Sequence, residues 1–262
     1  MRSYFLFFLF SISSEIFSQD FSSYEKHYFD APEVNVPYRY LRPLHQDSST
    51  RYPLVIFLHG AYQKGFDNES QLAIGGRFFL RDSIRAKYPA FILFPQCPVA
   101  DLWAYFETSI DSATGKPDKI IFPFHKKPTD VSGALMQLID SLIHQDHIDS
   151  TRVYIGGLSQ GGMGVLDLIA RYPEKFAAGL SICGAGDPAT SKRFSVKVSL
   201  WLFHGDNDSV VPLYFSRNYF KRLQKLKAEV KYSEYPGVDH DSWNNAFQEP
   251  ELMSWLFSKQ KK

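Results

Sequence analysis

The chain has 262 residues, of which 44% are hydrophobic and 22% are charged, and this provides enough apolar material for one substantial α/β core. Its 29 Lys and Arg residues nearly balance its 28 Asp and Glu residues, so the formal net charge at pH 7 is +1. Such a balance offers no long-range attraction to polyanions and argues against a nucleic-acid partner.

A short apolar run follows Met1 and Arg2 and ends near Phe17, where the polar segment Ser18-Gln19-Asp20 begins. This pattern is typical of a secretory signal peptide cleaved near Gln19, and the run is too short to span a bilayer comfortably. We therefore expect residues 1–19 to be a signal peptide and residues 20–262 to form one domain, secreted or periplasmic, without stable membrane insertion. An uncleaved anchor and a buried N-terminal strand are the alternatives.

Apolar runs typical of strands alternate with segments of helical periodicity along the rest of the chain. Because several strand runs are continuously apolar, they favour a parallel sheet buried on both faces. The pattern predicts an α/β fold with a mostly parallel eight-stranded sheet and helices on both faces. The expected strands are 24–28, 34–42, 54–58, 91–94, 153–155, 176–182, 196–203 and 229–235, and the main helices are 72–87, 130–147, 214–226 and 243–257, with another directly after Ser159.

Residues 96–129 show no clear periodicity, although they contain Trp103 and several other aromatic residues. A stretch of this length is uncommon unless it is functional or disordered, and its aromatic content argues against disorder. We interpret it as a wall over a ligand cleft, with a plain surface excursion as the alternative.

The segment Gly157-Leu158-Ser159-Gln160-Gly161 joins an apolar strand to a helical pattern. Gly-x-Ser-x-Gly occurs by chance in glycine-containing chains, but between a strand and a helix it is typical of a nucleophile elbow. The turn lifts the Ser159 hydroxyl above the sheet edge and leaves the Gln160 N–H facing the same space at a helix N-terminus.

A serine hydroxyl needs a base and an orienting carboxylate to become a good nucleophile. Two loops at the ends of later expected strands offer these groups: residues 204–212, with Asp206 and Asp208, and residues 235–243, with His240. His59 and His204 each end a strand before a glycine, and we interpret them as structural.

Together these motifs resemble those of the α/β-hydrolases, and the resemblance covers residues 34–257. His59-Gly60, Gly-x-Ser-x-Gly, His204-Gly205-x-x-Asp208 and the late His240 carry it. Gly65-Phe66-Asp67-Asn68, and Pro95-Gln96-Cys97-Pro98 followed by Trp103, are similar to secreted esterases related to polyhydroxybutyrate depolymerases, phospholipase/carboxylesterases and predicted peptidases.

The resemblance implies a catalytic set of Ser159, Asp208 and His240, with Asp206 as a turn or capping residue. It implies an oxyanion hole formed by the N–H groups of Ala61 and Gln160, with Tyr62 as the alternative to Ala61. The family often has His-Gly-x-Gly where this chain has His-Gly-Ala61-Tyr62. Because of this departure, both Ala61 and Tyr62 stay candidates for that donor. Substrate contacts are expected from Tyr62, Trp103 and Trp243.

The implied function is hydrolysis of carboxylic esters, small or polymer-linked, through an acyl-enzyme intermediate, by a monomer without metal or organic cofactor. A serine peptidase is the enzymatic alternative, and a non-catalytic binding protein on the same scaffold is the other. Only residues 183–194 separate two expected strands, so no large cap domain is expected there and the cleft should be open.

Only two cysteines occur, Cys97 and Cys183. In this fold's usual strand order they lie about three strand spacings apart, or roughly 14 Å, whereas bridged Cα atoms lie within about 7 Å. We expect two free buried thiols.

Overall fold

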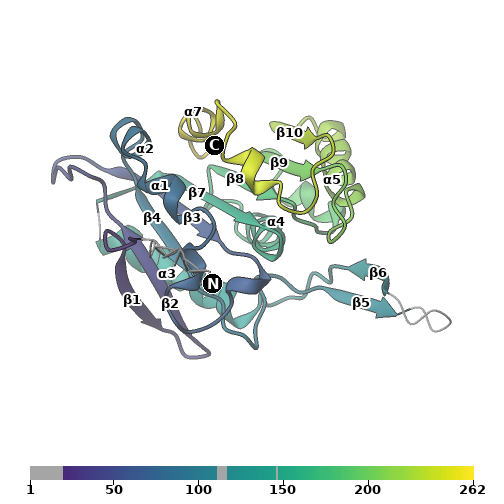
Figure 1. Ribbon diagram of the computed structural model, residues 1–262, viewed down its shortest axis with the longest axis horizontal. Helices are drawn as coiled ribbons and strands as arrows, with labels where there is room; N and C mark the ends of the chain where they lie inside the picture. Colours follow the sequence, from purple (N-terminus) through teal and green to yellow (C-terminus); the bar gives the residue numbers. More distant parts are fainter. Residues whose placement is uncertain (1–19, 111–116, 146) are drawn as a thin grey trace, which may run out of the picture.

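The main feature of the computed structural model, which describes residues 20–110, 117–145 and 147–262, is an eight-stranded sheet of order β1-β2-β4-β3-β7-β8-β9-β10 (Figure 1). Neighbouring strands from β4 to β10 are parallel, whereas β2 runs antiparallel to both β1 and β4. The predicted mostly parallel sheet is thus confirmed. The strands are β1 Glu25–Asp30, β2 Asn35–Leu41, β3 Tyr52–Leu58, β4 Phe91–Pro95, β7 Ile148–Leu158, β8 Ala178–Ile182, β9 Ser199–Gly205 and β10 Val230–Tyr235. The predicted signal peptide lies outside the described residues and stays a prediction.

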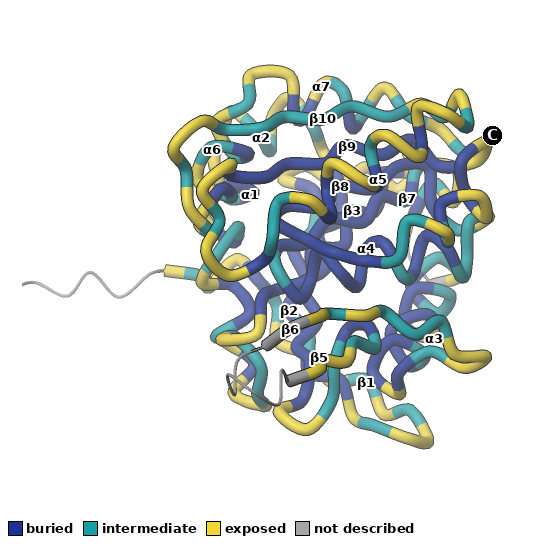
Figure 2. Tube along the Cα trace, turned by 90° about the vertical axis from the view of Figure 1, so that its right-hand side faces the viewer, coloured by how far each residue is buried: buried dark blue, intermediate teal, exposed yellow. Residues whose placement is uncertain are grey.

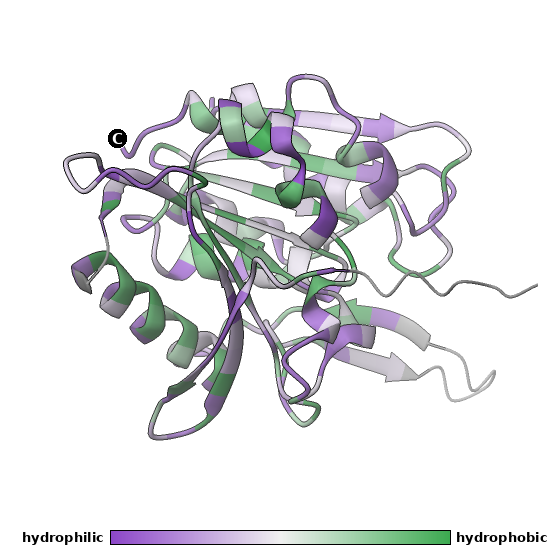
Figure 3. Ribbon diagram, turned by 60° about the vertical axis from the view of Figure 1, so that its left-hand side comes forward, coloured by the Kyte–Doolittle hydropathy of each residue, from purple (hydrophilic) through white to green (hydrophobic). Residues whose placement is uncertain are grey.

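Helices cover both faces of this sheet. One face packs against α3 (Asp130–Gln145), α4 (Gln160–Arg171) and α5 (Tyr214–Lys225). The other packs against α1 (Gly76–Leu80), α2 (Asp82–Lys87), α6 (Trp243–Ala246) and α7 (Leu252–Phe257). The side chains of β3 alternate between the two cores, which explains its continuous apolar sequence. The central strands are buried along most of their length in Figure 2, and Figure 3 shows mainly apolar residues on them.

Two of the predicted helices are each divided in two. The expected helix 72–87 consists of α1 (Gly76–Leu80) and α2 (Asp82–Lys87), separated at Arg81 by extended backbone with φ −58° and ψ 128°. The expected helix 243–257 consists of α6 (Trp243–Ala246) and α7 (Leu252–Phe257). Pro250 lies in the second gap, where it lacks the N–H that a continuous helix would need.

The segment 96–129 contains a two-stranded hairpin that the sequence pattern did not predict. Strand β5 (Glu107–Ile110) pairs antiparallel with β6 (Pro117–Ile121), and this pair forms a sheet of its own. The hairpin projects from the body of the molecule in Figure 1. No helix in the described part of the chain is long and apolar enough to cross a bilayer.

Candidate active site

Ser159 lies in a sharp turn between β7 and α4. Its backbone has φ 54° and ψ −120°, and its carbonyl accepts a hydrogen bond from the Met163 N–H at 3.0 Å. Such a conformation is strained for a residue with a Cβ and is typical of functional turns. A Cβ added to Gly161 would lie 2.1 Å from the Leu58 carbonyl oxygen, so the turn packs against β3 only because that position is glycine.

The side chains of Ser159, His240 and Asp208 form a continuous hydrogen-bonded chain. Ser159 Oγ lies 3.0 Å from His240 Nε2. On the other side of the ring, Nδ1 lies 2.9 Å and 3.1 Å from the two Asp208 carboxylate oxygens. Because a carboxylate only accepts hydrogen bonds, the Nδ1–H tautomer is favoured, which leaves Nε2 to accept the Ser159 hydroxyl hydrogen. The structure therefore brings together three of the residues singled out in the sequence.

The loops that carry Asp208 and His240 are held against each other by a side-chain hydrogen bond and by close backbone packing. The Gly237 N–H donates to Asp206 Oδ1 at 2.6 Å, which is the turn role expected of Asp206. A Cβ added to Gly205 would lie 2.1 Å from the Val238 carbonyl oxygen. Glycine at the end of β9 is thus required for the loop after β10 to approach it closely.

Asp239 makes a second link between these loops, and the sequence motifs did not identify it. Its Oδ1 accepts the N–H groups of Ser209 and of His240, each at 2.7 Å. The Ser209 hydroxyl lies 2.9 Å from the same oxygen. Asp239 therefore fixes the backbone on which the His240 ring is mounted.

The Asp208 side chain is fully buried, with 0% of its surface exposed. Its carboxylate accepts the N–H groups of Val210 and Val211 at 2.9 Å and 2.8 Å, in addition to His240. The His204 Nε2 approaches it at 3.1 Å from another side. Burial raises the pKa of Asp208, but the hydrogen bonds from His204, His240 and the two backbone N–H groups outweigh burial and hold the pKa well below its usual range. Asp208 is therefore ionised at neutral pH.

His204 is structural, as the sequence suggested, but it also contacts the candidate site. Its Nε2 faces two acceptors, the Val211 carbonyl at 2.9 Å and Asp208, so Nε2 carries a hydrogen. Its Nδ1 lies 2.7 Å from the Ser216 hydroxyl. His204 thus links β9, α5 and the carboxylate, a role that no motif indicated because the contact depends on how the following loop folds back.

The two candidate oxyanion donors lie on either side of the turn at Ser159. Gln160 begins α4, and Ala61 begins the short 3-10 turn Ala61–Gln63 that follows β3. A Cβ added to Gly60 would lie 3.7 Å from Ser159 Cβ, so that turn starts beside the serine. Within the described residues, the N–H groups of Ala61 and Gln160 have no hydrogen-bond acceptor. Both are available to an added acceptor.

A buried glutamine holds the loop after that 3-10 turn. Gln96 Nε2 donates to Asp67 Oδ1 at 2.7 Å and to the Gln63 carbonyl at 3.1 Å, while its Oε1 accepts the Asn68 N–H at 2.8 Å. The two motifs that suggested the secreted esterase subgroup therefore contact each other. Their structural role is to fix the segment that leads away from Ala61.

His59 adds a further brace at the ends of β3 and β4. Burial lowers the pKa of His59 to about 4, so the ring is neutral at pH 7. Its Nδ1 donates to the Gly60 carbonyl at 2.7 Å, and its Nε2 accepts the Cys97 N–H at 2.9 Å.

Of the three expected substrate contacts, Trp103 is contradicted by its position. Its side chain is 0% exposed, and its indole N–H donates to the His59 carbonyl at 3.1 Å. Trp103 belongs to the core because it packs against α4 at Gly164, where the lack of a side chain leaves room for it. Trp243 lies edge-on to the His240 ring at 5.7 Å, and Tyr62 is 97% exposed, so contact with a substrate stays a prediction for both.

The potential metal ligands found in the described part of the chain are Cys183, Asp208 and His240, whose ligand atoms lie within 4.8 Å of one another. Both nitrogens of His240 are already engaged, one with Ser159 and the other with Asp208. Burial raises the pKa of the Cys183 thiol, so at neutral pH it is protonated. These side chains are therefore arranged to form the hydrogen-bonded chain of Ser159, His240 and Asp208 rather than to bind a metal ion.

Comparison with known families and structures finds similarity to esterases and peptidases. The family model described as phospholipase/carboxylesterase matches residues 125–251, which include Ser159, Asp208 and His240. A comparison with curated protein sequences gave no significant match. A solved thermostable esterase is 33% identical to the chain with a TM-score of 0.80, covering 92% of this chain and 64% of its own length. The chain thus spans slightly less than two thirds of that esterase.

More distant structures share the fold. A ferulic acid esterase of Anaeromyces mucronatus, solved with ferulic acid, is 16% identical with a TM-score of 0.64, and the match covers 88% of this chain and 89% of that one. An acylaminoacyl peptidase of Pyrococcus horikoshii is 19% identical with a TM-score of 0.61, and the match covers 92% of this chain and 42% of that one. With the sheet order and the turn at Ser159, these likenesses show that the chain has the α/β-hydrolase fold.

Proposed function

We propose that the protein is a serine hydrolase that cleaves carboxylic esters, with Ser159 as nucleophile, His240 as general base and Asp208 as the group that orients His240. One observation carries this proposal: Ser159 Oγ lies 3.0 Å from Nε2 of a ring whose Nδ1 lies 2.9 Å from the buried Asp208 carboxylate. These distances are those at which a base can take the serine proton.

In the first half of the reaction, Oγ of Ser159 bonds to the ester carbonyl carbon as its proton passes to Nε2 of His240. The carbonyl oxygen becomes an oxyanion. When it collapses, the bond between the carbonyl carbon and the alcohol oxygen breaks, and the His240 imidazolium returns the proton to the departing alcohol. The alcohol leaves, and the acyl group stays on Ser159.

In the second half, a water molecule attacks the acyl carbon and gives its proton to His240. Collapse of the second oxyanion breaks the bond to Ser159 Oγ, which regains the proton from His240, and the carboxylic acid is released. Throughout, ionised Asp208 stabilises the imidazolium that forms twice per turnover.

The oxyanions are assigned to the N–H groups of Gln160 and Ala61, which start their helical turns beside Ser159 without another acceptor in the described structure. Loss of one such donor typically raises the barrier by about 3 kcal/mol. Among the amino acids only proline lacks a backbone N–H. Ala61→Pro is therefore the variant that tests this assignment.

Ester cleavage is favoured over amide cleavage by the esterase at 33% identity and by the phospholipase/carboxylesterase match. The likeness to acylaminoacyl peptidases lies below 20% identity and concerns the fold alone. The chemistry of the three side chains is the same for both reactions, so substrate comparison must separate them.

The test measures hydrolysis of p-nitrophenyl acetate and of an acyl-amino-acid p-nitroanilide by the wild type, Ser159→Ala and Ser254→Ala. We expect ester turnover by the wild type, little amide turnover, and a fall of about 10³-fold or more in kcat for Ser159→Ala. Ser254 is exposed on α7 and serves as the matched control, with unchanged kcat. Full ester turnover by Ser159→Ala would overturn the proposal.

A further inference from the structure

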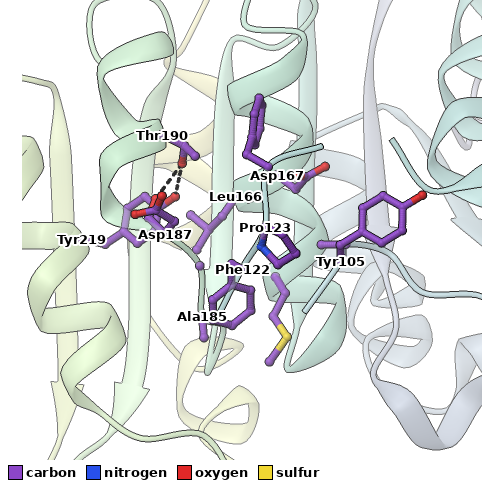
Figure 4. Close-up of a pocket in the computed structure, with 13 residues that line it drawn as sticks. Tyr105, Phe122, Pro123, Leu166, Asp167, Ala185, Asp187, Thr190 and Tyr219 are labelled. Carbon is purple, nitrogen blue, oxygen red and sulfur yellow. Dashed lines mark hydrogen bonds between the residues drawn. The ribbon is translucent and has the colours of Figure 1, made fainter. Parts of the chain in front are cut away.

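An apolar groove runs between the end of the β5–β6 hairpin and the loop after β8. Its volume is about 350 Å³, and its walls are Ile120, Ile121, Phe122 and Pro123 on the hairpin side and Gly186, Asp187, Pro188 and Phe215 on the other. A small recess, drawn in Figure 4, shares Phe122, Pro123, Gly186 and Asp187 with the groove and is also lined by residues of α4. Neither feature is used in the proposed chemistry.

The groove is linked to the residues that hold the reacting groups through the recess and an apolar cluster. Met163 lines the recess, and its N–H donates to the Ser159 carbonyl in the first turn of α4. Met163, Val211 and Phe215 belong to one buried apolar cluster against which Phe122 packs. Val211 in turn donates its N–H to the Asp208 carboxylate at 2.8 Å. Apolar packing therefore joins the groove to the turn at Ser159 and to the loop that carries Asp208.

The rim of the groove is apolar and exposed. Ile121, one of its walls, is 51% exposed, and Val210 and Tyr214, which flank Val211 and Phe215 in the chain, are 59% and 49% exposed. Phe122 and Phe215 meet edge to face at 5.4 Å, and Tyr214 lies 4.2 Å from Phe215. Clustered exposed apolar side chains are typical of an interaction site, and aromatic edges and faces favour a ring as the ligand.

The charge of the groove excludes an anionic ligand. Among the described residues that line it, Asp187 alone is charged, and its Oδ1 already accepts the Ala189 N–H at 2.8 Å. No cation faces the groove in that set of residues to balance a carboxylate or phosphate. The volume lies at the lower end of the roughly 300–1,000 Å³ found for pockets that bind organic ligands, which suits one ring-bearing group rather than a long chain.

We propose that this groove binds a neutral, ring-bearing apolar group of the substrate, so that the preferred substrates are esters with an arylalkyl group next to the scissile bond. This proposal rests on the proposed ester hydrolase function. The ring can come from the acid or from the alcohol, since both extend from the same carbonyl carbon. Burial of a ring in such a site favours reaction by about 10-fold or more over an ester that leaves it empty.

The experiment compares ethyl acetate, which has no ring, with ethyl 3-phenylpropanoate and 2-phenylethyl acetate, which carry a phenyl ring on the acid and on the alcohol side. All three release an alkyl alcohol, so no activated phenol leaving group masks the effect. Acid release is followed by titration at constant pH for the wild type, Ile121→Ser and Phe122→Ser. We expect one ring-bearing ester to exceed ethyl acetate in kcat/KM by about 10-fold or more, and both variants to reduce this ratio several-fold. The ester with the higher value identifies which side of the ester the groove holds.

Val196→Ser is the matched control for Ile121→Ser, because Val196 is also a β-branched side chain, is 72% exposed and lines no part of the groove. It should leave the ratio unchanged, and thermal unfolding should show all variants folded. The proposal is overturned if neither ring-bearing ester exceeds ethyl acetate, or if the groove variants keep the wild-type ratio. Failure of the wild type to hydrolyse any ester would instead overturn the proposed function.

Discussion

At the scale of single residues, Asp208 is notable because two imidazoles and two backbone N–H groups contact one buried carboxylate. A buried carboxylate without donors takes up a proton, and a protonated Asp208 would not stabilise a His240 imidazolium. His204 therefore acts as a positioning residue: it keeps Asp208 ionised and fixes the side of the carboxylate that faces His240.

His204→Leu tests this role. The substitution removes one donor to Asp208 and leaves the Val211 carbonyl and the Ser216 hydroxyl without their partner, so we expect a loss of about 1–3 kcal/mol in the free energy of unfolding at pH 7. Removal of a hydrogen bond to the carboxylate also raises the pKa of Asp208. The wild-type and variant proteins are compared by urea unfolding at several pH values.

The pH dependence separates this role from plain packing. Because the folded pKa of Asp208 is depressed, its contribution to stability is present above the unfolded pKa, near 4, and is lost as the pH falls through the folded value. In His204→Leu this contribution is smaller. The difference in free energy of unfolding between the wild type and the variant should therefore narrow below about pH 4. A deficit that is the same at every pH would contradict the role. Exposed His144→Leu is the control and should show neither effect.

Sequence patterns located Ser159 and His240 because the elbow motif and the loops after late strands are local features. The choice between Asp206 and Asp208 needed the family resemblance, since both lie in one loop. Trp103 shows where such patterns fail: an aromatic residue in an irregular segment can face the core or a cleft, and only packing against His59 and α4 decides.

At the scale of elements, the loop after β3 depends on an anchor from β4. Gln96 is 0% exposed and makes three hydrogen bonds to the segment Gln63–Asn68. The one large apolar side chain of that segment, Phe66, is 55% exposed, and the preceding Tyr62 is 97% exposed, so neither anchors the loop in the core. The position of the Ala61 N–H therefore depends on Gln96, although Gln96 belongs to another strand.

We expect Gln96→Leu to lower kcat for p-nitrophenyl acetate by about 10-fold or more, because a misplaced oxyanion donor acts on the transition state. The free energy of unfolding should fall by about 1–3 kcal/mol, since buried partners lose their hydrogen bonds. Gln137→Leu, on the exposed side of α3, is the control. Unchanged kcat in a folded Gln96→Leu protein would show that the loop holds its position without the anchor.

Two physical causes explain the features that the sequence did not predict. Strands β5 and β6 pair only with each other, so they carry no continuous apolar run that marks a buried strand. The breaks at Arg81 and between α6 and α7 leave apolar residues on the side that faces the sheet, so hydrophobic spacing alone does not reveal them. The central strands of the main sheet were predictable because burial on both faces requires such runs.

At the scale of the whole molecule, the strand order determines which distant segments meet. The turn after β7 and the loops after β9 and β10 all leave the carboxyl ends of parallel strands, so Ser159, Asp208 and His240 converge at one edge of the sheet. This convergence followed from the expected fold class. The same order separates other residues, and the two cysteines are the clearest case.

Cys97 follows β4 and Cys183 follows β8, and these strands lie three steps apart in the sheet. Both thiols are free and buried, and burial raises the pKa of Cys97 to about 12. We therefore expect a reductant such as dithiothreitol to leave Tm unchanged, because no disulfide constrains the unfolded chain. A thiol reagent should react with no cysteine in the native protein and with two in denaturant, since thiolates react and buried thiols are not ionised. A lower Tm in reductant, or fewer than two reactive thiols after unfolding without reductant, would show that the sheet brings the cysteines closer than this strand order allows.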